Sequence, residues 1–116
     1  MLSTMTMIDK LDLLEQALRV SIETSQAARE TTIDRRLHDR RINIERRWQG
    51  QVRWVYITAA AEPGPPDYVL FLGWYSDPSG QTFWEGRSLG DLAHAKELVC
   101  QWVLHGASPE TLFPGR

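Results

Sequence analysis

The chain has 116 residues, of which 42% are hydrophobic and 24% charged, and its formal net charge at pH 7 is -2. This length suits one domain with one core, because two half-sized cores would normally need disulfides or metals. A mean hydropathy of -0.36 and the lack of an apolar run of about 18 residues argue against a membrane-spanning helix, so we expect no membrane partner.

Two features bear on the cellular location. The first sixteen residues interrupt their apolar positions with four charged ones, which the apolar segment of a secretory signal peptide does not tolerate. Cys100 is the only cysteine, so no intrachain disulfide can form and a reducing compartment suits the chain. We therefore expect a cytoplasmic protein.

A first helix is predicted over about residues 7–30. Thr6 can cap it, with Asp9 three residues further on. The β-branched run at 31–33 disfavours helix and predicts the break, although a helix that continues through Arg41 is the alternative. Apolar residues recur at the spacing of one helix face at Ile8, Leu11, Leu14, Leu18 and Ile22.

Four antiparallel strands are predicted next. From Arg40 the apolar period changes to two, which indicates a strand. Turn signals follow at 48–51 and at Asp77-Pro78-Ser79-Gly80, and the stiff segment EPGPPD separates the two middle strands. The predicted strands cover about residues 40–48, 52–60, 68–76 and 82–85.

A second helix is predicted over about residues 89–105. Ser88 can serve as its N-cap with Asp91 at the third helical position, and Gly106 can end it. The fold class is therefore α+β, with an N-terminal helix, a four-stranded antiparallel meander and a C-terminal helix in a single domain over residues 1–116.

The two middle strands are apolar on both faces, which is unusual for an antiparallel sheet with one solvated face. Either the helices divide between the faces, or one face binds a partner or a second copy of the chain. We expect Trp84 and Trp102 to be buried against the helices. The candidate interface of a two-fold homodimer is the opposite face or the face that we assign to Trp54, Tyr56, Leu70, Leu72 and Trp74.

No catalytic, metal or cofactor motif stands out in the sequence. The three histidines, His38, His94 and His105, are scattered, and we expect Cys100 to be a small buried hydrophobe. The chain has no C-x-x-C, H-E-x-x-H, G-x-S-x-G or G-x-G-x-x-G pattern. These absences favour a protein that is not an enzyme and has no cofactor.

An arginine-rich stretch, DRRLHDRRINIERRW, covers residues 34–48. Residues 29–53 hold eight arginines and four acidic residues, a local balance of +4 in an acidic chain with a pI near 5.9. The stretch is interpreted either as arginines that pair with carboxylates beside a strand, or as a nucleic-acid grip. The second interpretation uses Arg35, Arg36, Arg40, Arg41, Arg46 and Arg47.

The main hypothesis is a non-catalytic protein-binding module, such as an adaptor, an inhibitor or a chaperone-like protein. It would act through an aromatic and apolar sheet face and an arginine-rich edge strand, because Trp and Arg are enriched in binding hot spots. A nucleic-acid-binding regulator is the alternative. The candidate partner-binding residues are Arg40, Arg41, Arg46, Arg47, Trp48, Trp54, Tyr56 and Trp74.

Overall fold

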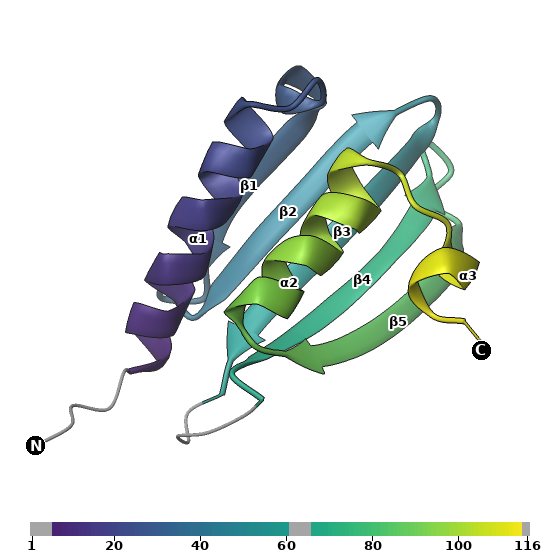
Figure 1. Ribbon diagram of the computed structural model, residues 1–116. Helices are drawn as coiled ribbons and strands as arrows, with labels where there is room; N and C mark the ends of the chain where they lie inside the picture. The colour runs from purple at the N-terminus through teal and green to yellow at the C-terminus, as the bar shows by residue number, and fades with distance from the viewer. Residues whose placement is uncertain (1–5, 61–65, 115–116) are drawn as a thin grey trace, which may run out of the picture.

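A computed structural model describes residues 6–60 and 66–114, in which helices and an antiparallel sheet form an α+β fold. Five antiparallel strands follow one another in the sheet in chain order, and the two long helices lie over the same face of it (Figure 1). The elements are α1 (Met7–Glu23), the 3₁₀ turn η1 (Ala28–Glu30), β1 (Thr31–Arg36), β2 (Arg41–Trp48), β3 (Gln51–Ala59), β4 (Tyr68–Ser76), β5 (Thr82–Gly90), α2 (Leu92–Val99), the π-helical turn η2 (Cys100–Leu104) and α3 (Pro109–Leu112).

Helix α1 begins as predicted and ends seven residues earlier than predicted. Thr6 and Asp9 form the expected capping box, and the predicted apolar stripe is buried except for Ile8, which is exposed. The helix stops at Glu23 rather than at residue 30. Side-chain hydroxyl groups donate hydrogen bonds to the last carbonyls of the helix: Thr24 Oγ1 donates to Val20 O, and Ser25 Oγ donates to Ile22 O.

The prediction of four strands was wrong, because residues 31–36 form an additional strand. β1 pairs antiparallel with β2, from Thr31 opposite Arg46 to Arg36 opposite Arg41. The β-branched run that was expected only to break the helix therefore begins a strand, which excludes a helix that continues through Arg41. The other predicted strands are confirmed to within one residue at their starts, and the predicted loop EPGPPD lies for the most part outside the described residues.

The boundary between the last strand and the second helix also differs from the prediction. β5 continues to Gly90, so Ser88 is a strand residue rather than an N-cap. Asp91 caps α2 instead, and its Oδ1 accepts a hydrogen bond from the backbone N–H of His94 at 2.8 Å. The predicted helix 89–105 is thus α2 followed by η2, and Gly106, with a φ of 68°, ends it as expected.

The core lies between the sheet and the two helices. Trp102 is fully buried as predicted, whereas Trp84 is partly buried and Cys100 is partly exposed instead of buried. No helix in the described part of the chain is both long and apolar enough to span a membrane. The buried core residues include Leu11, Leu14, Leu18, Ile42, Ile44, Val55, Ile57, Leu70, Leu72, Leu98, Val99 and Val103.

Tyr68 fastens the start of β4 to α1. Its side-chain hydroxyl donates a hydrogen bond of 2.5 Å to the backbone carbonyl of Lys10, and only 2% of the residue is exposed. Burial, together with the negative charge of Asp67, raises the pKa of Tyr68 to about 12. The folded state therefore favours the neutral phenol.

This raised pKa predicts a specific loss of stability at alkaline pH. Below pH 10, Tyr68→Phe should be less stable than the wild type by about 1 kcal/mol, because it lacks one hydrogen bond. As the pH rises from 10 towards 12, the phenol ionises more readily in the unfolded chain, so the wild type alone loses up to roughly 2 to 3 kcal/mol. Urea unfolding of both proteins from pH 8 to 11 measures this, and a pH-independent difference would contradict it.

Candidate binding face

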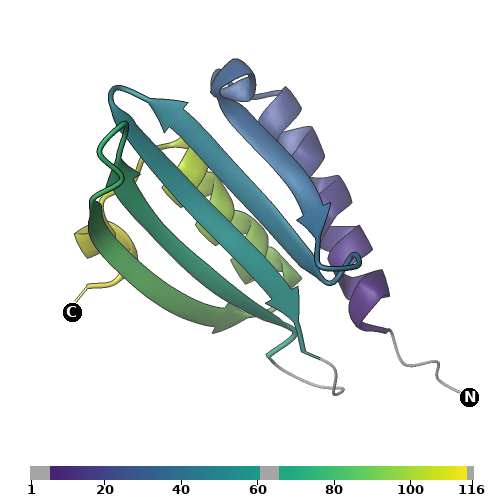
Figure 2. The same cartoon turned by 180° about the vertical axis from the view of Figure 1, so that it is seen from behind.

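One face of the sheet carries no helix of the described chain, as the view from behind shows (Figure 2). We call it the open face. In each strand, every second side chain packs against the helices, and the side chains between them point to the open face. The open face carries Arg41, Asn43, Glu45 and Arg47 of β2, Trp54 and Tyr56 of β3, Phe71 and Tyr75 of β4, and Glu85 and Arg87 of β5.

Three aromatic side chains form a stacked row across the middle of the open face. The ring centroids of Trp54 and Tyr56 are 5.3 Å apart, and those of Tyr56 and Phe71 are 5.0 Å apart. The guanidinium of Arg41 lies 3.6 Å from the centroid of the Tyr56 ring. The row is half-buried by these mutual contacts, and it gives the face a preformed aromatic surface.

A depression of about 310 Å³ lies beside the aromatic row. Trp54, Tyr56 and Phe71 line it on one side, and Glu85, Gly86 and Arg87 of β5 line it on the other. Trp54 lies close against β4 because its neighbour there is a glycine. A Cβ atom added to Gly73 would stand 2.5 Å from Cζ2 of Trp54, so a larger residue at this position would displace the indole.

The predicted dimer face mixed residues from both sides of the sheet. Trp54 is opposite Gly73 and Tyr56 is opposite Phe71 in the β3–β4 pair. Leu70 and Leu72 are therefore on the helix side, where they are fully buried. The alternation within each strand was read correctly, but a shift of one residue in the pairing between strands exchanges the two faces.

Arg35 of β1 ties this edge strand to α1. Its Nη1 lies 2.7 Å from Asp12 Oδ1 and 3.0 Å from Glu15 Oε1, and its guanidinium also donates to the backbone carbonyl of Asp39. Partial burial opposes the charge, but the hydrogen bonds and the charges of Asp12 and Glu15 outweigh it and raise the pKa of Arg35. This arginine is a structural clamp between sheet and helix.

Arg46 connects β2 to the carboxyl end of η2. Its Nη1 donates to the carbonyls of Val103 and Leu104 at 3.0 and 3.1 Å, and its Nε lies 2.9 Å from Glu30 Oε2. The same guanidinium lies 4.1 Å from the ring centroid of Trp48. A cation is favourable here because the carbonyls at the end of a helix carry partial negative charge.

Arg53 of β3 lies directly opposite Arg46, and it also donates hydrogen bonds to carbonyls near the end of η2. Its Nη1 donates to the carbonyls of Trp102 at 3.0 Å and of Ala107 at 2.5 Å, and its guanidinium lies 4.1 Å from the Trp102 ring centroid. Burial and the nearby charge of Arg46 lower the pKa of Arg53. No pattern in the sequence indicates this role, because the two carbonyls are 49 and 54 residues away along the chain.

The eight candidate residues thus separate into three groups. Arg41, Arg47, Trp54 and Tyr56 lie together on the open face. Arg46, Trp48 and Trp74 are on the helix side, where Trp48 faces Gly106 and Trp74 packs against the core. Arg40 is exposed in the turn between β1 and β2.

The remaining arginine contacts of the stretch are exposed or only partly buried. Arg36 pairs with Asp34 at 3.1 Å, and Arg47 pairs with Asp77 at 3.1 Å. Arg41 donates from Nε to Asn43 Oδ1 at 2.7 Å. Most of the arginine-rich stretch therefore satisfies its charges within the chain.

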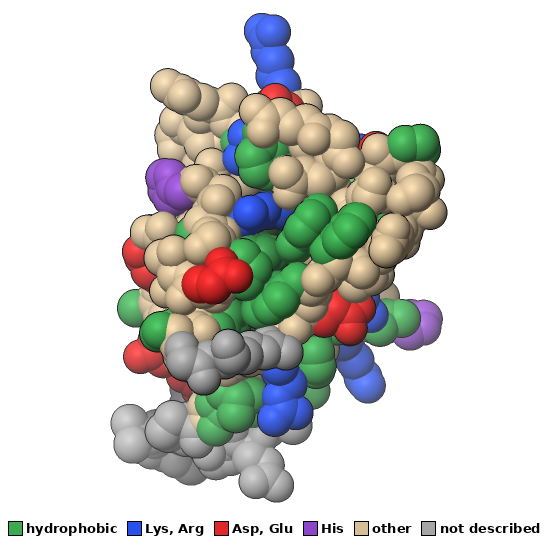
Figure 3. Space-filling model, turned by 90° about the vertical axis from the view of Figure 1, so that its right-hand side faces the viewer, with side chains coloured by type: hydrophobic (Ala, Val, Ile, Leu, Met, Phe, Trp, Pro, Cys, Tyr) green, Lys and Arg blue, Asp and Glu red, His purple; other side chains and the backbone are tan. Residues whose placement is uncertain are grey.

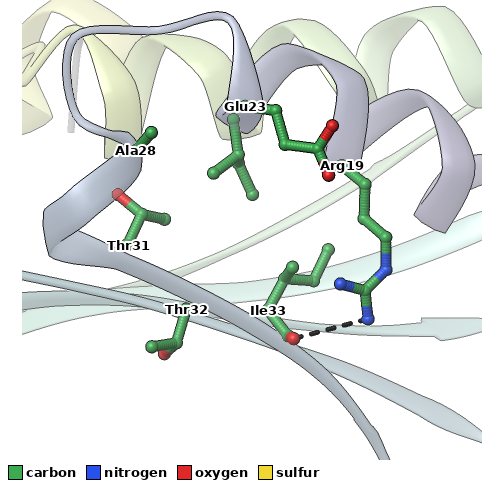
Figure 4. Close-up of a pocket in the computed structure, with 7 residues that line it drawn as sticks. Arg19, Glu23, Ala28, Thr31, Thr32 and Ile33 are labelled. Atoms are coloured by element: carbon green, nitrogen blue, oxygen red, sulfur yellow. Dashed lines mark hydrogen bonds between the residues drawn. The ribbon is translucent and has the colours of Figure 1, made fainter.

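A second depression, of about 300 Å³, lies between the last turns of α1 and the start of β1 (Figure 4). Arg19 crosses one end of it and donates a long hydrogen bond of 3.5 Å to the carbonyl of Ile33. The Thr31 hydroxyl is already used, because it donates to Ala27 O at 2.8 Å. The lining offers the cation of Arg19, the carboxylate of Glu23, the hydroxyl of Thr32 and apolar walls, and it contains no His or Cys.

A serine–histidine pair at the start of α2 was missed by the sequence analysis. Ser88 Oγ and His94 Nε2 are 2.9 Å apart, across the junction of β5 and α2. The imidazole rests on Gly90, where an added Cβ would stand 2.1 Å from its Cδ2. Within the described residues no hydrogen bond joins the other ring nitrogen to a carboxylate, so the pair lacks the third group that orients a catalytic histidine.

In the described part of the chain, no group of three or more His, Cys, Asp or Glu side chains is placed to hold a metal ion. Comparisons of the chain with family models, with curated proteins and with solved structures find no match. The residues and their geometry are therefore the basis for the functional argument.

Proposed function

We propose that the chain is a non-catalytic protein-binding module, of the adaptor, inhibitor or chaperone-like kind, that binds its partner on the open face. The observation that carries the proposal is the stacked row of Trp54, Tyr56 and Phe71 beside the depression on a sheet face without a helix. Preformed aromatic surfaces with arginines nearby are typical of the centres of protein interfaces.

The chemistry of the depression favours one kind of contact. Its aromatic wall suits an aliphatic or aromatic side chain, and its size of about 310 Å³ is at the lower end for binding pockets. Glu85 and Arg87 at the rim offer one acceptor and one donor of opposite charge. We infer a partner protein that inserts one apolar side chain and pairs its own charges with this rim.

The nucleic-acid alternative has weaker support from the same contacts. Arg35, Arg36, Arg46 and Arg47 all form ion pairs within the chain, so few arginines of the stretch are free to neutralise phosphates. Tyr56 is already stacked between other groups and offers little free ring surface to a base. If this alternative holds, affinity for DNA or RNA should be measurable at about 50 mM salt and fall steeply as salt rises.

The test is a quantitative capture from host lysate with three baits: the wild type, Phe71→Glu and Val20→Glu. Phe71 lies in the aromatic row, whereas Val20 is 61% exposed on α1 and away from the open face, so it is the matched control. We expect a stoichiometric protein that the wild type and Val20→Glu retain and that Phe71→Glu loses by about tenfold or more, the cost of a charge in a hot spot.

Circular dichroism checks that each bait is folded, and Phe71→Thr, which keeps strand propensity, replaces Phe71→Glu if that variant unfolds. A protein that all baits retain equally would place binding elsewhere on the molecule. Recovery of nucleic acid without a stoichiometric protein would reject the proposal in favour of the alternative.

A further inference from the structure

The outer edge of β5 pairs with no other strand in the described part of the chain. β5 is the last strand of the sheet order, and it is nine residues long. Within the described chain, no backbone hydrogen bond outside the sheet ladder involves residues 82–90. A long edge strand with unpaired N–H and C=O groups is a template for pairing with another strand.

β5 has some of the features that usually protect an edge, namely two charged residues and an irregular pairing with β4 between Trp74 and Tyr75, but not others. It has no proline and no lysine, and two of its apolar residues are about half exposed, Phe83 at 49% and Leu89 at 47%. Hydrophobic side chains gather on this side of the molecule, with acidic and basic side chains beside them (Figure 3). The opposite edge strand, β1, is shorter and carries three charged residues in six.

The sequence of β5 is self-complementary about Gly86. If two copies pair antiparallel with Gly86 on the two-fold axis, Glu85 of one copy stands opposite Arg87 of the other, and the reverse pair forms by symmetry. Directly opposed residues of opposite charge stabilise an antiparallel pair, and like charges destabilise it.

Both members of this charge pair are available. Glu85 and Arg87 are exposed, and neither forms an ion pair or a side-chain hydrogen bond among the described residues. We propose that two copies of the chain pair through β5 in this register and form a continuous ten-stranded sheet. The proposal goes beyond the proposed function, because it concerns the edge of β5, although Glu85 and Arg87 also form the rim of the depression beside the aromatic row.

Sedimentation equilibrium over micromolar to hundreds of micromolar protein tests the pairing. The wild type should approach twice its mass of 13.3 kDa. In the Glu85→Arg dimer, residues 85 and 87 of the two copies are both arginines, so two pairs of like charges face each other. In the Arg87→Glu dimer, both pairs consist of glutamates. Each single variant should weaken the dimer by about tenfold or more. The double variant Glu85→Arg with Arg87→Glu restores opposite charges and should restore the dimer.

Glu23→Arg, at the end of α1 and away from β5, carries the same change in net charge and should leave the dimer intact. The double variant also shows that both substituted residues are compatible with folding. A monomeric wild type at the highest concentration overturns the proposal. So does a dimer that resists both single variants, a double variant that stays dissociated, or a Glu23→Arg variant that dissociates equally. The capture experiment substitutes Phe71 and leaves Glu85 and Arg87 unchanged, so a failed capture and a monomeric wild type are distinguishable outcomes.

Discussion

Replacing Trp102 with alanine is expected to lower the free energy of unfolding by about 3 to 5 kcal/mol. Trp102 is fully buried, and its ring packs against Trp84 with the centroids 5.1 Å apart. Its Nε1 donates to the carbonyl of Gly73 at 3.3 Å, and the guanidinium of Arg53 lies over its ring. The substitution therefore leaves a large cavity where η2 meets β3, β4 and β5.

Urea unfolding followed by far-ultraviolet circular dichroism measures the effect without the tryptophan signal that the variant loses. Domains of this kind have a total stability of roughly 5 to 15 kcal/mol, so the expected loss is a large share of the total. Val20→Ala, at a position that is 61% exposed on α1, is the control and should change stability by less than about 0.5 kcal/mol. A loss below about 1 kcal/mol for Trp102→Ala would contradict the described core.

The strands that could be predicted are those with a strong apolar period. β2 has buried residues at alternate positions, and β3 and β4 are largely apolar runs between turn signals, so the pattern along the chain located them. β1 has only Ile33 as an aliphatic residue, and its extended state depends on pairing with β2. Such a strand depends on a tertiary contact more than on its own sequence. The sequence therefore predicted only the end of the first helix at this position.

The sequence predicts that the candidate site is aromatic, but it does not predict which residues of neighbouring strands share the same face of the sheet. Trp54 and Tyr56 were identified from their positions on β3, but Leu70 and Leu72 were predicted beside them, where the structure places Phe71. The segment between β3 and β4 is too long to fix the register, and every assignment of faces across strands depends on it. Gly73 is the one local signal, since a glycine in a strand often marks the close approach of another group.

From the sequence, the arginines of the stretch could bind phosphates or carboxylates. In the structure, backbone carbonyls are a third class of partner. Arg46 donates to carbonyls of η2 that are 57 and 58 residues away along the chain. Arg53, just outside the stretch, donates to the carbonyls of Trp102 and Ala107, which are 49 and 54 residues away along the chain. No spacing rule within a strand predicts such partners, because helix ends are brought to the sheet only by the overall fold.

Replacing Arg53 with alanine is the second prediction, and we expect it to lower the free energy of unfolding by about 2 to 4 kcal/mol. Arg53 is only 8% exposed, and its removal leaves the Trp102 and Ala107 carbonyls without their donor, at about 1 to 3 kcal/mol for each buried group. The desolvation that lowers the pKa of Arg53 is relieved by the substitution, and this offsets part of the loss.

Arg47→Ala is the matched control, because the Arg47 side chain is 55% exposed and its carboxylate partners Glu45 and Asp77 are exposed as well. It should cost less than about 1 kcal/mol, and the cost should shrink further in about 1 M NaCl, since salt screens exposed ion pairs. The Arg53 effect should persist at high salt, because its partners are neutral carbonyls in a buried site. Equal costs for the two variants would show that Arg53 does not hold the end of η2, and the structural interpretation of these arginines would then be wrong.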